Sequence, residues 1–584
     1  MTEKRTFRWE AWAVFGLALV ARLVYLRSIM DEPLYLVPQV DARLYWETAL
    51  SIVRGEAQDA VFYLPPFYSW FLASIVRVAG EDVGVVRHVL AIVAALAAPV
   101  TLLLAEPIVG RARALGAGVI VALSAPAVFY SAELLTASLV LVLNAAALYV
   151  LARSERGAGF AGYGLAGLLI GVSAITHPSI LLFPLLLVLR YRTNWRAVAL
   201  LVLGLFLAIL PVTLHNALGG DAALVSTNGG VNFYLGNHAG ADGKSAVAPD
   251  LPNEPGDARR TAAAIARASV PYEIGPRDVS RYWMNRATTW IRENPGDWAR
   301  LTFRRLMYSL NAHEISDNID FYGAAEQSLP LRAMPVRFGL LIALSLAGLP
   351  VLLRERQGRL LALYALAVLI PLLLFFVVGR FRLALLPFLA VTGSVGLFEL
   401  WRTLRKWRHR LQRKELVRAP VLFAAGLALA YVNVFDVNED RSWHYYYLSG
   451  DATYRHGNPL RAVEYFEQAQ VRNPESPLVR NALGFAYAET GQRLEHAEDL
   501  VRGALDREPG RRRFYLDSLG WILFKQGKHR EAATAFEQAI PLFGPGEEAS
   551  RAEALTHLAA VREAQGRTGD ARRLRAEAAR LLAP

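Results

Sequence analysis

The residues best placed for chemistry in this sequence are an aspartate and a tyrosine in its first polar segment, Asp41 and Tyr45. Residues four positions apart share one face of a helix, so the two side chains would point the same way. A carboxylate beside a substrate hydroxyl can orient that hydroxyl or remove its proton. The structural alternative is that Asp41 only stabilises the start of a helix through the helix dipole.

Three arginines have positions that suit phosphate binding. Arg22 lies inside the first apolar run, and Arg380 and Arg382 lie in a short turn between two late apolar runs. An ionisable residue inside a membrane segment is a functional candidate by default, and the planar guanidinium matches phosphate oxygens. Contact with lipid headgroups is the alternative. We expect the three arginines to bind a phosphate at headgroup depth.

Composition indicates an integral membrane protein. The 584 residues are 54% hydrophobic and 20% charged, and long apolar runs alternate with short basic loops up to about Phe435. The formal net charge is +12, but lysines and arginines that flank apolar runs signal membrane orientation, so we expect no nucleic-acid partner. The absence of cysteine excludes disulfides, thiolate metal sites and cysteine nucleophiles.

A membrane-spanning helix needs about 20 mainly apolar residues. Apolar segments of this kind predict an all-α, polytopic helix bundle with about eleven spans, at residues 9–26, 85–109, 112–130, 134–151, 160–176, 180–189, 197–214, 336–353, 360–378, 383–400 and 421–435. The stretch from 160 to 189 can be divided differently, because His177 and Pro178 interrupt it.

Every second loop between these segments is rich in arginine and lysine, from Lys4 at the N-terminus to the cluster at 402–418. Cytoplasmic loops carry this excess, so we expect a bacterial inner-membrane protein with a cytoplasmic N-terminus. Among the short outer turns, only the one at Arg380 breaks the pattern. Residues 27–84, 215–335 and everything after about 436 then lie outside the cytoplasm.

The sequence after Asp436 repeats a helix-pair pattern. A glycine is followed by an alanine and, four positions later, by a large apolar residue, and the alanines are 35 residues apart: Gly450, Ala462 and Phe466; Gly484, Ala497 and Val501; Gly520, Ala532 and Phe536. A weaker fourth unit lies around Ala571 and Ala578. The pattern resembles tetratricopeptide repeats. We expect an α-solenoid at residues 437–584 with a protein or peptide partner on its concave face.

A second resemblance covers roughly residues 9–400. The motifs that carry it are Asp41-x3-Tyr45, Pro65-Pro66-x-Tyr68, the acidic turn Ser131-Ala132-Glu133, residues 226–230, Gly236-Asn237, and the turn Gly379-Arg380-Phe381-Arg382. Their order and common outer placement resemble the polyprenyl-phosphate-sugar-dependent glycosyltransferases of GT-C fold. That group includes protein O-mannosyltransferases and aminoarabinose transferases that modify lipid A. Members of the latter kind carry a lysine before the proline pair, whereas this chain has Leu64.

The resemblance implies roles for individual residues. Asp41 matches the catalytic carboxylate of the family, and Glu133 matches its second acidic position. Substrate contact is implied for Tyr45, Tyr68 and Asn237. The resemblance also implies a polyprenyl-phosphate sugar as donor, with its phosphate at Arg380, Arg382 and Arg22.

We therefore expect a GT-C-like domain at residues 1–436 that moves a sugar, with inversion, from a donor in the bilayer to an extracytoplasmic protein or glycan. Two alternatives stay open. One is a polysaccharide polymerase or O-oligosaccharide ligase, and the other is a non-enzymatic envelope scaffold that presents the repeats to a peptide. No metal-site spacing occurs among the histidines and acids. We therefore predict no metal ligand, although catalysis with a divalent metal stays open.

Overall fold

The computed structural model describes residues 2–251, 255–407, 417–437, 441–544 and 547–582. Within these ranges the regular elements are helices, and extended pairing is limited to two isolated bridges, Ser124 with Val336 and Ala248 with Leu251. The prediction of an all-α fold is confirmed.

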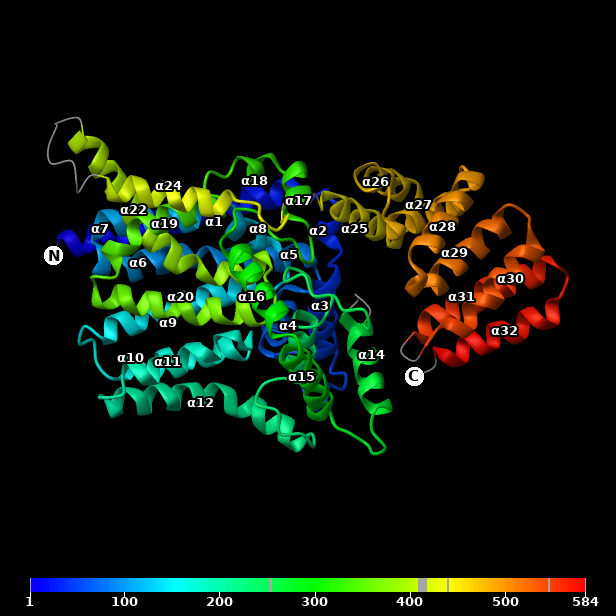
Figure 1. Cartoon of the computed structure of the whole chain (residues 1–584), viewed down its shortest axis with the longest axis horizontal. Helices are drawn as coiled ribbons and strands as arrows, with labels where there is room; N and C mark the ends of the chain where they lie inside the picture. The colour runs from blue at the N-terminus through cyan, green and yellow to red at the C-terminus, as the bar shows by residue number, and fades with distance from the viewer. Residues whose placement is uncertain (1, 252–254, 408–416, 438–440, 545–546, 583–584) are drawn as a thin grey trace.

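Apolar helices lie side by side in a bundle at one end of the molecule (Figure 1). Its elements are α1 (Thr2–Ile29), α5 (Val83–Ala95), α6 (Ala97–Val109), α7 (Arg111–Ala122), α8 (Ala125–Ala132), α9 (Ala137–Ser154), α10 (Ala161–Ala174), η1 (Pro178–Leu181), α11 (Leu182–Arg190), α12 (Trp195–Leu218), α19 (Phe338–Leu352), α20 (Arg356–Leu374), α21 (Gly379–Arg382), η2 (Leu383–Leu385), α22 (Leu386–Trp407) and α24 (Arg418–Tyr431).

Among the residues that the structure describes, six helical stretches are long and apolar enough to cross a membrane, at Trp9–Ile29, Val83–Val109, Ala137–Ser154, Trp195–Leu218, Arg356–Leu374 and Gly379–Arg405. Five apolar helices are shorter, at Phe67–Ala79, Ala161–Ala174, Pro178–Arg190, Phe338–Leu352 and Arg418–Tyr431. The count of about eleven spans therefore stays a prediction. The segment expected as one helix at 112–130 is divided between α7 and α8, and the amide of Ala125 after the break donates to the carbonyl of Val336 at 2.9 Å.

Small residues allow helices of the bundle to touch through their backbones. A Cβ at Gly167 of α10 would lie 2.0 Å from the carbonyl oxygen of Leu201, and one at Gly204 of α12 would lie 2.0 Å from that of Gly164. Membrane helices pack closely in this way because lipid supplies little hydrophobic drive for their association. The apolar pattern thus specifies the helices, and the glycines specify which of them meet.

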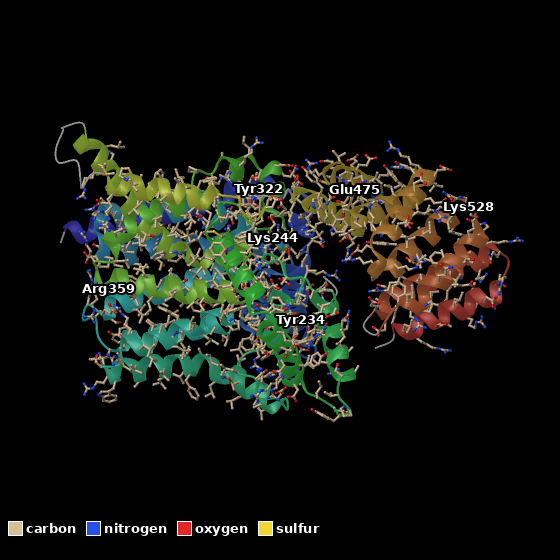
Figure 2. All side chains as sticks on the ribbon, in the orientation of Figure 1. Tyr234, Lys244, Tyr322, Arg359, Glu475 and Lys528 are labelled. Carbon is tan, nitrogen blue, oxygen red and sulfur yellow. The ribbon has the colours of Figure 1, made fainter. Side chains whose placement is uncertain are left out.

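The two long segments predicted outside the membrane fold into short helices at one end of the bundle (Figure 1). These helices, which we call the outer helices after their predicted location, are α2 (Pro33–Leu36), α3 (Val40–Arg54), α4 (Phe67–Ala79), α13 (Gly229–Gly236), α14 (Pro255–Ala268), α15 (Pro276–Glu293), α16 (Pro295–Leu310), α17 (Phe321–Gln327) and α18 (Leu329–Ala333). Figure 2 shows Tyr234, Lys244 and Tyr322 at this end and Arg359, from a predicted cytoplasmic loop, at the opposite end.

The C-terminal part forms four antiparallel helix pairs. They are α25 (Ser442–Arg455) with α26 (Pro459–Arg472), α27 (Pro477–Thr490) with α28 (Leu494–Arg507), α29 (Arg512–Lys525) with α30 (His529–Ala539), and α31 (Glu548–Ala564) with α32 (Thr568–Leu581); η3 (Pro509–Arg511) and η4 (Ile540–Leu542) connect them. A Cβ at Gly520 would lie 2.9 Å from the Phe536 ring. The repeated glycine therefore makes room for the repeated large residue, as the pattern predicted, and the weak fourth unit is a complete helix pair.

The first repeat is docked on the outer helices. Tyr446 of α25 donates a hydrogen bond to Glu326 of α17 at 2.7 Å and accepts one from Gln327 at 2.8 Å. Arg472 of α26 pairs with Glu326 at 3.0 Å, and Tyr445 is buried in the same hydrophobic cluster as the bundle. The division at residue 436 stays a prediction, and this packing gives the repeats a fixed position on the outer helices.

Candidate active site

Asp41 lies in the first turn of α3, at the outer end of the bundle. The preceding residue, Val40, has a φ of 51°, in the left-handed region that β-branched residues rarely adopt. Such a conformation costs about 1–3 kcal/mol and persists only where the surroundings impose it. The Asp41 side chain keeps 25% of its surface exposed, so a substrate can reach its carboxylate.

Arg380 of α21 joins Asp41 to a second aspartate. Its guanidinium lies 2.7 Å from the Asp41 carboxylate and 2.6 Å from the carboxylate of Asp317, in the loop before α17. Burial raises the pKa of Asp317, although Arg380 opposes this effect. Two carboxylates thus share one guanidinium, and the structure brings the predicted catalytic residue and a predicted phosphate ligand into direct contact.

The turn that carries Arg380 needs a glycine at its first residue. The amide of Gly379 donates to the carbonyl of Ile315 at 2.8 Å. A Cβ at Gly379 would lie 2.5 Å from the Tyr130 hydroxyl and 2.9 Å from Glu314. The backbone of the turn is therefore pressed against residues on both sides, which fixes the starting point of the Arg380 side chain.

Arg382 has a different environment from Arg380. Its side chain is completely buried and pairs with Glu314 at 3.0 Å. It also donates to the carbonyls of Tyr308, Asn311 and His313 at 2.7–3.0 Å. These bonds hold the segment after α16 against α21 and occupy the donors expected to face phosphate. The phosphate role of Arg382 stays a prediction that its contacts do not favour.

Arg22 is also completely buried. One of its nitrogens donates to the carbonyl of Ala18 at 2.9 Å, within the same helix, and two nitrogens have no hydrogen-bond partner among the described residues. No contact in the described part of the chain joins it to Arg380. The structure therefore does not place Arg22 at the Asp41 site, and its phosphate role stays a prediction.

Glu133 directly follows α8 and caps the C-terminal end of that helix. It is buried, and its carboxylate lies 3.8 Å from the guanidinium of Arg87. Burial raises the pKa of Glu133, and Arg87 counteracts this effect. Arg87 also donates to the carbonyls of Tyr35 and Leu34 at 2.7 and 2.8 Å. Glu133 and Arg87 thus fix the outer segment against α5 and α8.

The two predicted substrate tyrosines contact each other. Tyr45 lies one turn after Asp41 on α3, and its ring meets the Tyr68 ring edge to face at 5.0 Å. Tyr68 is completely buried and its hydroxyl has no hydrogen-bond partner among the described residues. Burial and the Asp41 carboxylate raise the pKa of Tyr45. The pair forms the wall behind Asp41 and stays neutral at physiological pH.

Asn237 is held by its neighbours. It is completely buried, donates to the carbonyls of Phe233 and Leu374 at 2.9 and 2.8 Å, and accepts from Arg305 and Trp298 at 3.2 Å. Arg305 is completely buried as well and also donates to the carbonyl of Leu373. This arrangement ties the start of the large outer segment to α16 and α20. The amide groups of Asn237 are therefore occupied by protein partners. Its predicted contact with a substrate stays a prediction.

A cleft of about 880 Å³ runs along α3, away from Asp41. It is bounded by α3, the 55–66 loop, α4 and α14. Tyr63 in its wall connects it electrostatically with Asp41: burial raises the pKa of Tyr63 to about 12, with Arg259 opposing and Asp41 adding to this rise. Asp41 itself does not line the cleft, which begins one helical turn further along α3, at Leu44.

Sequence reasoning missed two of these residues, Asp317 and Arg87. Asp317 is one acid among several in a long polar segment, and only the fold brings it to Arg380. Arg87 could have been found, because it is a charged residue inside an apolar run. Among the described residues, no cluster of three or more histidine, aspartate or glutamate side chains could hold a metal ion.

No protein-family model and no curated protein matches this sequence. Solved structures that are similar to it include ArnT from Cupriavidus metallidurans bound to undecaprenyl phosphate, with 14% identity over 91% of this chain and 81% of that chain and a TM-score of 0.39. AglB from Archaeoglobus fulgidus, an oligosaccharyltransferase in complex with an inhibitory peptide and a dolichol-phosphate, has 15% identity, 78% and 59% coverage and a TM-score of 0.35.

A third similar structure, MamA from Desulfovibrio magneticus RS-1, covers 32% of this chain and 94% of its own, with 16% identity and a TM-score of 0.21. ArnT and AglB have GT-C folds and MamA has a fold like that of tetratricopeptide repeats. Structures of both kinds expected from the sequence are therefore among those similar to this chain.

Proposed function

We propose that this chain is a membrane glycosyltransferase that moves a sugar from a polyprenyl-phosphate donor to an acceptor hydroxyl, with inversion. The observation that carries the proposal is the contact of Asp41 and Asp317 with Arg380 at the outer end of the apolar helices. A base for a hydroxyl and a cation for a phosphate are the two groups that such a transfer needs. They lie in direct contact, one helical turn from the start of the cleft along α3.

The contacts of Arg380 suggest an order of events. With no donor present, Arg380 pairs with both carboxylates. A donor phosphate would compete for the guanidinium, because arginine binds phosphate and carboxylate through the same donors. Asp41 released from Arg380 would have its carboxylate oxygens free to accept the proton of the acceptor hydroxyl.

The transfer step then uses two residues. Asp41 accepts the proton of the acceptor hydroxyl while the hydroxyl oxygen forms a bond to the anomeric carbon. The bond from that carbon to the phosphate oxygen breaks, and the polyprenyl phosphate leaves with the electron pair. Arg380 stabilises the charge that develops on the leaving phosphate. Attack opposite the leaving group inverts the anomeric configuration without a covalent enzyme intermediate.

The apolar helices fit a donor with an isoprenoid tail. The tail would lie against the exposed apolar surface of the bundle and place the phosphate at its outer end. The basic loops predict a cytoplasmic N-terminus in a bacterial inner membrane, with the site and the repeats outside the cytoplasm. A protein or glycan of the cell envelope is then the acceptor.

Transfer of label tests this proposal. Membranes that contain the protein are incubated with radiolabelled polyprenyl-phosphate sugars and an envelope extract. We expect one donor to label an acceptor, with a mass increase of a single sugar. A mass increase of an oligosaccharide would instead support a polymerase or ligase. Absence of label with every donor, from folded protein, would contradict the proposal.

A further inference from the structure

The cleft beside Asp41 follows one face of α3. Leu44, Thr48 and Ser51 line it and continue the line of Asp41 at helical spacing. A helix rises 1.5 Å per residue, so Ser51 lies about 15 Å beyond Asp41 along the axis. The cleft therefore starts one turn from the proposed base and leads away from it over the length of α3.

The walls of the cleft carry charges of both signs and aromatic rings. Arg259, Arg260 and Arg267 of α14 lie on one side. Glu47, Glu56 and Asp59 come from α3 and the loop after it, and Phe62 and Trp70 add aromatic surface. Arg259 bridges the two sides, because it pairs with Asp59 at 2.7 Å and lies over the Tyr63 ring at 4.9 Å. This surface suits a polar chain with mixed side chains and does not suit a lipid tail.

The repeat domain contributes one residue to the wall of the cleft. Glu548, the first residue of α31, lines the cleft together with residues of α14. The repeats are also fixed at their other end, where Tyr446 and Arg472 bind Glu326. The repeat array thus touches the outer helices at its first pair, and Glu548 of its last pair is part of the cleft wall. The cleft is incomplete without the repeat domain.

A row of aromatic side chains includes one residue from each of the four repeats. Tyr454, Phe485, His557 and Trp521 come from the first helices of the four pairs, and neighbouring rings lie 5.8, 6.4 and 4.5 Å apart. Glu489 accepts hydrogen bonds from Trp521 at 2.6 Å and from Tyr454 at 3.1 Å. Glu489 thus holds two of the rings, those of Trp521 and Tyr454, in place. Such a preorganised aromatic row can bind an extended chain at a low cost in side-chain entropy.

We propose, building on the proposed function, that the acceptor is an extended polypeptide whose hydroxyl residue lies at Asp41 and whose neighbouring residues occupy the cleft and continue onto the aromatic row of the repeats. The repeat domain would then raise the local concentration of the acceptor at the active site. Glu548 of the cleft wall and His557 of the aromatic row belong to the same helix, α31.

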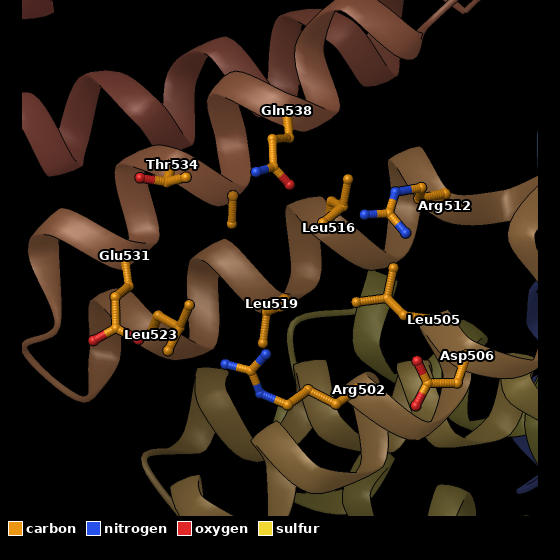
Figure 3. A pocket seen from close by; sticks show the side chains of 11 residues that line it. Arg502, Leu505, Asp506, Arg512, Leu516, Leu519, Leu523, Glu531, Thr534 and Gln538 are labelled. Carbon is orange, nitrogen blue, oxygen red and sulfur yellow. The ribbon is translucent and has the colours of Figure 1, made fainter.

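Peptide binding to full-length protein in lipid nanodiscs tests the inference. The probe is a fluorescent pool of peptides of about 12 residues, each with a central threonine, which span about 40 Å when extended. Ser51→Trp and Ala264→Trp fill the cleft from opposite walls, and Trp521→Ala interrupts the aromatic row. Thr534→Trp is the matched control, because it fills a different cavity, of about 470 Å³, between α28, α29 and α30 (Figure 3).

We expect each cleft-filling variant to weaken peptide binding about tenfold or more and Trp521→Ala to weaken it about fivefold. Thr534→Trp should bind like the unchanged protein, and melting temperatures exclude unfolding as the cause. Unchanged binding in both cleft variants would overturn the inference. The inference would also be overturned if envelope oligosaccharides displaced the fluorescent peptides while unlabelled peptides did not, because the cleft would then bind a glycan.

Asp41→Asn separates this inference from the enzyme assignment. The variant should bind the peptide pool within about twofold of the unchanged protein and fail to transfer sugar. If the cleft variants bind peptides normally while Asp41→Asn abolishes transfer, the polypeptide acceptor is wrong and the glycosyltransferase stands. If the cleft variants lose binding while Asp41→Asn still transfers sugar, the roles proposed for Asp41 are wrong and the peptide site stands.

Discussion

The guanidinium of Arg380 contacts the Asp41 carboxylate at 2.7 Å, although α3 and α21 lie at opposite ends of the membrane part of the sequence. Asp317 contacts the same guanidinium at 2.6 Å. This arrangement neutralises the proposed base while no donor is bound. It also means that a change at any one of the three residues alters the charge balance of the other two.

Replacement of Arg380 is the first test of this balance. Arg380→Gln leaves two carboxylates close together and partly buried, so it should lower the free energy of unfolding by roughly 3 kcal/mol. It also removes the cation for the leaving phosphate, so the rate of sugar transfer should fall by about 100-fold or more. Adding Asp317→Asn removes one carboxylate and should restore much of the stability without restoring transfer. Thermal unfolding and label transfer measure the two effects. Equal recovery of both would show that Arg380 acts only in folding.

For Arg382 we expect an effect mainly on stability and a smaller effect on phosphate binding. Arg382→Gln removes the partner of buried Glu314 and bonds to three carbonyls, so we expect a large loss of stability, of roughly 3 kcal/mol. The affinity for polyprenyl phosphate of the fraction that stays folded should change less than in Arg380→Gln. Titration of both variants with the lipid phosphate makes the comparison. A greater loss of affinity in Arg382→Gln would restore Arg382 as the phosphate ligand.

The sequence predicted much of the fold because its signals are local. Apolar runs predicted the helices, and the repeated glycine and large residue predicted the helix pairs that Gly520 and Phe536 form. Asp41 and Arg380 were recognised separately, by motif and by placement. Their contact, and the presence of Asp317 between them, depends on how distant segments pack. Asn237 shows the same limit: its motif was visible, but its burial against Arg305 was not.

The repeat glycines make a test of packing. Gly520→Ala would place a methyl group 2.9 Å from the Phe536 ring, and such overpacking should destabilise the protein by about 1–3 kcal/mol. Gly569→Ala is the control, because a Cβ there has no described atom within 4 Å and alanine favours a helix. Unfolding in denaturant measures both. Equal stability of the two variants would contradict the packing of the pair.

The stability of the repeats should depend on pH through His557. Burial lowers the pKa of His557, but its hydrogen bond to Asp517 and the nearby acids outweigh this, so the pKa is raised. An unfolded histidine titrates near pH 6.5. The stabilisation is therefore complete below about pH 6.5 and is lost as the pH rises through the folded pKa.

Melting temperatures across this range check the effect. Relative to His557→Gln, the unchanged protein should lose stability as the pH rises above about 6.5. The same slope in both proteins would mean that the pair of His557 and Asp517 contributes nothing that depends on protonation.

The dependence of transfer on Asp41 is the most direct test of the whole account. Asp41→Asn keeps the side-chain shape and should reduce transfer from the polyprenyl-phosphate sugar by about 100-fold or more, since general bases contribute about 10²–10⁴-fold. Asp278→Asn is the matched control, because Asp278 also begins an outer helix and pairs with an arginine, Arg281, at 2.7 Å. The account predicts that Asp278→Asn transfers sugar normally. Normal transfer by folded Asp41→Asn would contradict it.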